Sequence, residues 1–318
     1  MRSPFVLISA CAFASIALGA HADTTTVITH GFTTGSKGNW VQGMCEAIIA
    51  RAGNVGAVYR YTGATGVWTH VPAAGGDGSN TNIVLIFNWV PESAGVSAGP
   101  NWNYVQAAGD VLYALLRDPK YAVGNSGPTD LVTGRTLQLI GHSRGACLIS
   151  ETARRFAVAG ITVDQLTFHD PHPVNGTLDA PLNFNWGDPV PVRWSNVTWA
   201  DNYWRADGGG FNALDFDGIP LNNVHNLNLN EAALNCCADS LAHLDVHTWY
   251  YGTVDLATPT NDGEQDVTAQ MRTTWWQEAP AALGYTLRGY YYSALAGGSA
   301  TRPAIPPGTA PPAGSAPI

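Results

Sequence analysis

The chain of 318 residues is poor in charged side chains. Asp, Glu, Lys and Arg together make up 12% of it, and 24 acidic residues against 15 basic ones give a net charge of −9 at pH 7. A protein that binds DNA or RNA depends on clustered Lys and Arg to neutralise the phosphates. The charge balance therefore argues against nucleic acid as a partner.

Long apolar runs are also missing, apart from a short one at the start of the chain. Residues 1–22 place Arg2 before an apolar stretch and end in Ala20-His21-Ala22, a pattern typical of a secretory signal peptide cleaved near Ala22. The apolar stretch is shorter than the roughly 20 residues that a membrane-spanning helix needs. We therefore expect a secreted protein, extracellular or periplasmic, without a transmembrane segment.

Cysteine is scarce, and the sequence has no CxxC pair to support a zinc site or a redox dithiol. An oxidising compartment permits disulfides among the four cysteines that follow the signal segment, in three alternative pairings. The sequence does not choose among these pairings. The four residues are Cys45, Cys147, Cys236 and Cys237.

Four short β-branched or apolar runs, each bounded by Gly, Asn or polar residues, predict buried parallel strands. Three other segments repeat apolar residues at intervals of three and four, which predicts helices. The strand segments are residues 24–29, 83–87, 136–140 and 165–168, and the helical segments are residues 40–52, 104–116 and 146–159. Their alternation predicts an α/β fold with a mostly parallel, doubly wound sheet and helices on both faces.

We expect one catalytic domain over residues 23–295, with two segments that break the alternation of strand and helix. Residues 183–235 are rich in Asn, Asp, Gly and Trp without clear periodicity, which indicates an irregular excursion near the active site. Residues 296–318 consist largely of Pro, Ala and Gly, a composition typical of a disordered tail.

The motif Gly141-His142-Ser143-Arg144-Gly145 stands between a predicted strand and a predicted helix. A GxSxG nucleophile elbow needs this context, because the turn is too tight for side chains at the two glycines and holds the serine at the sheet edge. The amides and dipole at the start of the following helix would face a developing oxyanion. The motif therefore predicts Ser143 as a catalytic nucleophile.

Two more predicted strands end in residues that suit an acyl-transfer site. His30-Gly31-Phe32 matches an HG-type oxyanion loop, so we predict the amides of Phe32 and Arg144 as the two oxyanion donors. Asp170 ends the strand after the nucleophile strand, where an acid would orient the catalytic histidine and stabilise its charged form. The reserve candidates for the acid are Asp188, Asp201 and Asp207.

Two histidines compete for the role of general base. His243 and His247 lie four residues apart in a predicted helical segment. A general base has to reach Ser143 freely, which favours His243 at the helix start and leaves His247 as the alternative base. A pair with this spacing also binds metals, but the glutamate of an HExxH motif is missing. We predict neither a metal nor a cofactor.

With these motifs in place, the chain resembles the pancreatic-lipase-like family of α/β-hydrolases, as a divergent bacterial member, over most of residues 25–254. The resemblance rests on THGFTTGSKGNW, on the nucleophile motif, on Asp170-Pro171, and on HLDVHTWYYGTV, which starts at His243. Asn88 replaces an acidic residue of the family, and Arg144 replaces a leucine. The family's second domain, lid and calcium ligands do not map onto the chain. The resemblance implies the α/β-hydrolase fold and independently prefers His243.

These residues predict a secreted serine hydrolase of the lipase or esterase type, which cleaves carboxylic esters through an acyl-enzyme. Lipid, polymeric and soluble esters all stay open as substrates. An amidase, peptidase or thioesterase is an alternative, because the motif fixes acyl transfer and not the leaving group. A non-catalytic binding protein on a hydrolase scaffold is another. Aromatic residues of the irregular segment are candidates for an acyl or polymer groove, namely Trp186, Trp194, Trp199, Trp204 and Phe211.

Overall fold

The computed structural model describes residues 22–33, 39–63, 65–90, 92–94, 104–118, 130–176, 185–206, 216–230, 242–276 and 288–313. Most of the predicted signal segment, Asp207, Phe211, Cys236 and Cys237 lie outside these ranges. Within them, none of the helices has the length and apolar character needed to cross a membrane.

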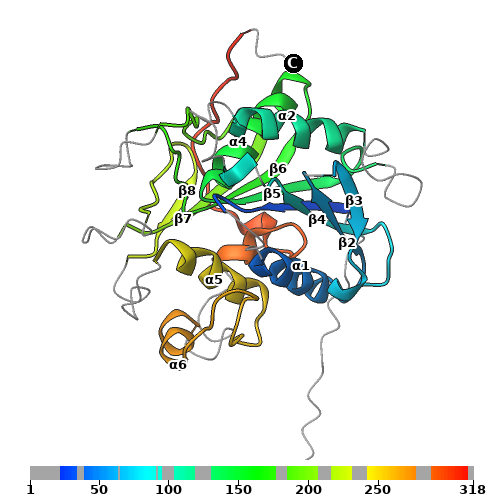
Figure 1. Ribbon diagram of the computed structural model, residues 1–318, viewed down its shortest axis with the longest axis vertical. Helices are drawn as coiled ribbons and strands as arrows, with labels where there is room; N and C mark the ends of the chain where they lie inside the picture. The colour runs from blue at the N-terminus through cyan, green and yellow to red at the C-terminus, as the bar shows by residue number, and fades with distance from the viewer. Residues whose placement is uncertain are drawn as a thin grey trace, which may run out of the picture.

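An eight-stranded sheet forms the middle layer of the protein, with strand order β3-β2-β4-β1-β5-β6-β7-β8 (Figure 1). Every neighbouring pair is parallel except β2 and β3, which pair antiparallel at one edge. The strands are β1 (Thr24–Thr29), β2 (Ala57–Thr62), β3 (Val67–His70), β4 (Asn82–Asn88), β5 (Thr136–His142), β6 (Val163–His169), β7 (Val197–Trp204) and β8 (His225–Asn228). The predicted α/β-hydrolase fold with a mostly parallel sheet is confirmed.

Helices cover both faces of the sheet, also as predicted. Helices α2 (Tyr104–Arg117) and α4 (Arg144–Val158) lie on one face, and α1 (Asn39–Arg51) and α5 (Ala242–Val254) lie on the other (Figure 1). Helix α6 (Ala269–Met271) continues into a π-helical turn, Arg272–Trp276. Short 3-10 turns span Pro72–Ala74, Glu92–Ala94, Gly289–Tyr292 and Ser299–Thr301.

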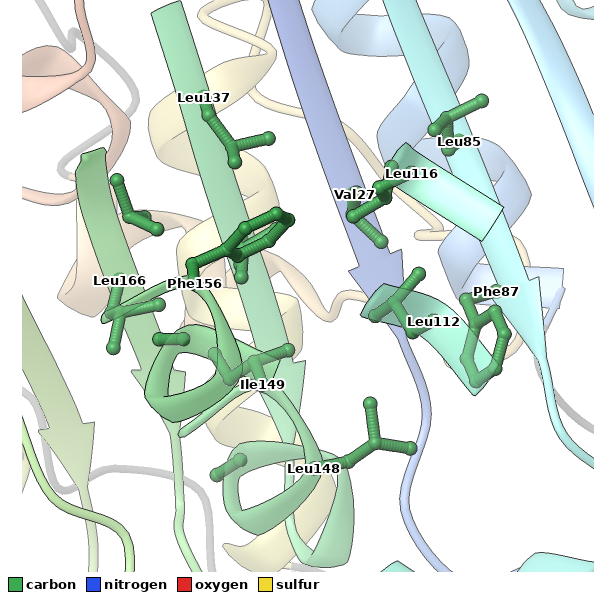
Figure 2. Close-up of a cluster of buried hydrophobic side chains, with 14 of the residues drawn as sticks. Val27, Leu85, Phe87, Leu112, Leu116, Leu137, Leu148, Ile149, Phe156 and Leu166 are labelled. Carbon is green, nitrogen blue, oxygen red and sulfur yellow. The ribbon is translucent and has the colours of Figure 1, made fainter. Parts of the chain in front are cut away.

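The central strands supply side chains to two hydrophobic cores, one on each face. Successive residues of a strand point to opposite faces, so Val27 packs with α2 and α4 while Ile28 packs with α1 and α5. Because both faces are buried, β4 is a continuous apolar run from Ile83 to Phe87, and the threonines of β1 are buried as well. Figure 2 shows the first core, in which Val27, Leu85, Phe87, Leu137 and Leu166 of the strands meet Leu112, Leu116, Leu148, Ile149 and Phe156 of the helices.

Strands β7 and β8 extend the sheet, so the expectation of an irregular excursion over residues 183–235 is wrong where these two strands form. The buried residues of β7 include Asp201 and Asn202 beside apolar and aromatic ones, so the segment lacks the apolar run of a buried strand. Asn202 Nδ2 donates to Asn226 Oδ1 at 2.8 Å, and Tyr203 Oη donates to Asp201 Oδ2 at 2.7 Å. Burial raises the pKa of Asp201 to about 6. Mutual hydrogen bonds allow these polar groups to lie inside the sheet.

The cysteines of the described chain do not form the disulfides considered from the sequence. Cys45 and Cys147 are both buried free thiols. They belong to different cores, on opposite faces of the sheet. Burial raises the pKa of both thiols, which keeps them protonated.

The C-terminal segment is packed along residues 296–313, so the expectation of a disordered tail is wrong there. Thr309 forms a backbone bridge with Trp194, and its amide donates to the Arg193 carbonyl at 2.8 Å. Trp199 Nε1 donates to the Pro303 carbonyl at 3.0 Å. Proline has no amide proton but keeps its carbonyl oxygen. The segment is therefore held by donors on the body of the protein, a source of order that composition does not reveal.

Arg302 links this segment to the N-terminal end of β6. Its guanidinium donates to both carboxylate oxygens of Asp164 at 3.1 and 2.8 Å and to Gln165 Oε1 at 2.8 Å. We expect Arg302→Ala to lower the free energy of unfolding by roughly 1–3 kcal/mol, because these charge-assisted hydrogen bonds are lost. Urea denaturation measures the change. Arg117→Ala, at an exposed position of α2, is the control, and equal midpoints for the two variants would contradict the expectation.

Candidate active site

Ser143 stands at the turn between β5 and α4 in a backbone conformation that few residues other than glycine adopt, with φ 56° and ψ −125°. A Cβ atom on Gly145 would lie 2.6 Å from the His30 carbonyl oxygen, and one on Gly141 would lie 2.8 Å from the Ala146 amide nitrogen. The two glycines of the motif are therefore required by the packing of the turn. The geometry is that of a strained nucleophile elbow.

The loop after β1 lies against this elbow because β1 and β5 are neighbours in the sheet, with Thr29 opposite Gly141. A Cβ atom on Gly31 would lie 2.8 Å from Ser143 Oγ. Only a glycine allows the backbone to approach the serine so closely. Phe32, the predicted oxyanion donor, follows with its side chain 40% exposed.

Residues at the end of β4 hold this loop in place. Trp89 Nε1 donates to the His30 carbonyl at 2.9 Å. The ring nitrogens of His30 lie 2.8 Å from the Gly31 carbonyl oxygen and 3.1 Å from Asn88 Oδ1. Burial lowers the pKa of His30, so the ring is neutral and its single proton serves one of these oxygens. Asn88, which the resemblance marked only as a departure, is part of the loop's support.

Asp170 and His243 form a buried pair at the same edge of the sheet. Strand β6 lies beside β5, with His169 opposite His142, so Asp170 and Ser143 follow neighbouring strands directly. Asp170 Oδ2 lies 2.5 Å from His243 Nδ1, at the start of α5. Two predicted site residues, 73 positions apart in the sequence, are thus brought into contact.

Arg205 supports both members of this pair, a role that no sequence signal indicated. Its backbone amide donates to Asp170 Oδ1 at 2.7 Å. Its guanidinium donates to Asp245 Oδ2 at 2.6 Å, two residues beyond His243 on α5. A side chain on Gly218 would collide with Asp170 Oδ1, so the backbone also closes over the acid. The Asp170 carboxylate is therefore fixed in position before any substrate binds.

His142, the first variable residue of the GxSxG motif, also contacts His243. Its Nε2 donates to the His243 carbonyl at 2.9 Å, and the two rings are 4.5 Å apart. Burial lowers the pKa of His243, and the nearby imidazoles of His172 and His247 lower it further. The ring is therefore neutral at neutral pH, which is the form that accepts a proton.

His247 belongs to a second histidine–aspartate pair in the core behind the site. It is fully buried, its Nδ1 lies 3.0 Å from Asp262 Oδ2, and its ring stacks on Trp40 at 4.3 Å. Asp262 also accepts hydrogen bonds from Thr248 Oγ1 and from the Gln265 amide, each at 2.7 Å. Burial alone would raise the pKa of Asp262, but the hydrogen bonds and the His247 charge lower it to about 2.

The His247–Asp262 pair makes the free energy of unfolding depend on pH in the acid range. The pKa of Asp262 falls from an ordinary 3.8 to about 2 on folding, so its stabilisation is present above pH 3.8 and is lost as pH falls towards 2. We expect Asp262→Asn to lower the free energy of unfolding by about 2 kcal/mol at pH 7, and the gap to wild type to narrow below pH 4. Urea unfolding at several pH values measures it, with exposed Asp266→Asn as the control. A gap that is constant from pH 7 to pH 2.5 would contradict this account.

The side chain of Arg144 is buried beside Ser143. Its guanidinium donates to both oxygens of Asp188, at 2.6 and 2.8 Å, and to the Ser93 carbonyl at 2.7 Å. The guanidinium carbon also lies over the rings of Trp89 and Trp186, 5.4 and 4.7 Å from their centroids. The reserve acid Asp188 is thus paired with Arg144, and the other described reserve, Asp201, is inside the sheet. One feature of the sequence pointed to the Arg144–Asp188 pair, namely that Arg144 stands where the resembled family has a leucine.

The aromatic residues expected to line a groove lie in different places. Trp186 stacks on Phe32, with ring centroids 5.7 Å apart. Trp194 donates to the Ser150 carbonyl at 2.8 Å, and Trp199 packs under the C-terminal segment. The prediction that Trp194 and Trp199 line a groove at the active site is therefore wrong, because both side chains hold other segments of the protein in place. Trp204 ends β7.

No group of three or more His, Cys, Asp or Glu residues in the described chain has an arrangement that could hold a metal ion.

No protein-family model and no curated protein matches the chain.

Three solved structures share distant similarity with the chain. A putative cell surface hydrolase from Lactobacillus plantarum WCFS1 has 12% identity and a TM-score of 0.38, over 80% of this chain and 98% of that one. Aspergillus fumigatus lipase B has 12% identity and a TM-score of 0.37, over 86% and 61%. The product of gene lin2722 from Listeria innocua has 13% identity and a TM-score of 0.35, over 57% and 70%. The resemblance to the pancreatic-lipase-like family stays a prediction.

Proposed function

We propose that the protein is a serine hydrolase that cleaves carboxylic esters through an acyl-enzyme, of the lipase or esterase type. The observation that carries this proposal is the 2.5 Å contact between Asp170 Oδ2 and His243 Nδ1, at the sheet edge where Ser143 occupies its strained turn. An acid that orients a neutral histidine beside such a serine is the arrangement that activates a hydroxyl nucleophile. The substrate of this proposal is a carboxylic ester, whether lipid, polymeric or soluble.

In the proposed reaction, Ser143 Oγ attacks the ester carbonyl carbon while His243 Nε2 accepts the hydroxyl proton. Asp170, beside Nδ1, stabilises the imidazolium that forms. The amides of Phe32 and Arg144 donate to the oxyanion of the tetrahedral intermediate. His243 then gives the proton to the departing alcohol, and a water molecule, activated by the same histidine, hydrolyses the acyl-enzyme.

The surroundings of the two histidines favour His243 as the base. The Nδ1 of His243 is engaged by Asp170, which leaves its Nε2 for the serine. His247 is engaged by Asp262 and covered by Trp40, in the core below the site. A fully buried ring in a second pair has no path to substrate.

The sequence of residues 1–22 supports export as part of this proposal. Cleavage near Ala22 would leave β1 intact, since that strand begins at Thr24. We propose that the enzyme acts outside the cytoplasm on an ester present there.

Substitution of the triad tests the proposal. On nitrophenyl esters of graded chain length, we expect Ser143→Ala, Asp170→Asn and His243→Ala each to lower kcat by about 10⁴-fold or more. His247→Ala should keep kcat within about tenfold of wild type at a temperature where circular dichroism shows it folded. Val190→Ala, 48% exposed, is the matched control.

Wild-type turnover by Ser143→Ala would refute the proposal. Loss of turnover in His247→Ala, but not in His243→Ala, would show that His247 is the general base, and Ser143 would remain the proposed nucleophile. Parallel assays on amides and thioesters of the same acyl group identify the leaving group. We expect ester turnover to exceed amide turnover in kcat/KM.

A further inference from the structure

The two residues proposed as oxyanion donors are joined through their own side chains. The Phe32 ring stacks on Trp186, with centroids 5.7 Å apart and planes inclined by 26°. The Arg144 guanidinium carbon lies 4.7 Å from the centroid of the same Trp186 ring. Phe32, Trp186 and Arg144, which we call the donor stack, thus connect the loop after β1 to the first residue of α4.

The arginine end of the donor stack is held rigidly. Arg144 and Asp188 are 1% and 0% exposed in their side chains, and they make a two-point ion pair. Asp188 Oδ2 also accepts the Val174 amide at 3.1 Å, while the third guanidinium nitrogen donates to the Ser93 carbonyl. A planar guanidinium with its donors paired in this way has one orientation.

Trp186, the middle member, is held by its own backbone and by its neighbours. Its amide donates to the Val174 carbonyl at 2.8 Å. Asp188, two residues later, carries the ion pair with Arg144. Gln106 Nε2 of α2 donates to the Gly187 carbonyl at 3.2 Å. The tryptophan ring is therefore a fixed surface for Phe32 to stack on.

Phe32 is the member that needs such a surface. Its side chain is 40% exposed, so burial does little to fix the ring. Its backbone follows Gly31, which lies against Ser143, so a small shift of the loop moves the proposed donor amide relative to the serine. Oxyanion stabilisation depends on donors that are in place before charge develops.

We propose that Trp186, held by the Arg144–Asp188 pair, is a positioning residue that sets the Phe32 amide relative to the Arg144 amide in the oxyanion hole. This inference rests on the proposed function, because it concerns the amides that stabilise the oxyanion of that reaction. A donor displaced by about 1 Å is expected to cost up to about 100-fold in rate. The loss appears in kcat, since the contact is made in the transition state, and KM changes little.

The test compares Trp186→Ala, Trp186→Phe and the control Val190→Ala in the full chain. We expect Trp186→Ala to lower kcat on a nitrophenyl ester by about 10- to 100-fold with KM within about threefold. Trp186→Phe keeps a ring for stacking and should return kcat to within about threefold of wild type. Val190→Ala, in the same segment, should match wild type. Thermal unfolding followed by circular dichroism verifies that each variant is folded.

The affinity for a trifluoromethyl ketone inhibitor is a second measurement, and it would not change if Trp186 had only a structural role. Ser143 Oγ adds to the ketone carbon, its proton moves to His243, and the resulting oxyanion occupies the donor site. We expect Trp186→Ala to weaken this inhibitor by the same factor that kcat falls. A rise in KM with unchanged kcat and unchanged inhibitor binding would assign Trp186 to substrate contact and overturn the inference.

The outcomes separate this inference from the proposed function. If wild type does not hydrolyse the ester, or if Ser143→Ala retains turnover, the proposed function fails and the inference fails with it. If wild type is active, Ser143→Ala is inactive and Trp186→Ala behaves as wild type, only the inference fails. If Ser143→Ala is inactive, Trp186→Ala loses kcat and inhibitor affinity, and Trp186→Phe and Val190→Ala behave as wild type, both stand.

Discussion

The backbone of Ser143 is the constraint on which the surrounding structure depends. A positive φ at a residue with a side chain is unfavourable by about 1–3 kcal/mol, and it persists only where neighbouring structure enforces it. Here the turn is enclosed by backbone on several sides, and Gly31, Gly141 and Gly145 are the positions where a side chain would collide. The close fit needs β1, β5 and β6 side by side, because the backbone at the end of each strand contributes to the packing around the turn.

Buried charge pairs hold the segments that meet at this edge. Arg144 and Asp188 join α4 to the segment before β7. Arg205 and Asp245 join the end of β7 to α5. In a chain with only 12% charged residues, these pairs lie inside the protein rather than on its surface. Loss of one partner from such a pair leaves an uncompensated charge, so each pair defines one arrangement of its loops.

The sequence predicted those parts of the fold whose burial is apolar. Strands β1, β4, β5 and β6 lie close to the expected segments because each contains β-branched or apolar residues that pack in the hydrophobic cores. Strand β7 was missed because Asp201 and Asn202 are buried by hydrogen bonds rather than by hydrophobicity. The packed C-terminal segment was missed for a similar reason, since its order depends on donors such as Trp199 that are distant in the sequence.

The sequence by itself determined the fold class and the candidates for chemistry, because a glycine-flanked serine between strand and helix has few structural solutions. It also placed Asp170 at a strand end. Only the tertiary structure decided which histidine meets that acid, since His243 and His247 share one helix and each lies against a different aspartate. The donor stack was likewise decided in three dimensions, because Phe32, Arg144 and Trp186 come from separate segments and meet only when the sheet has formed.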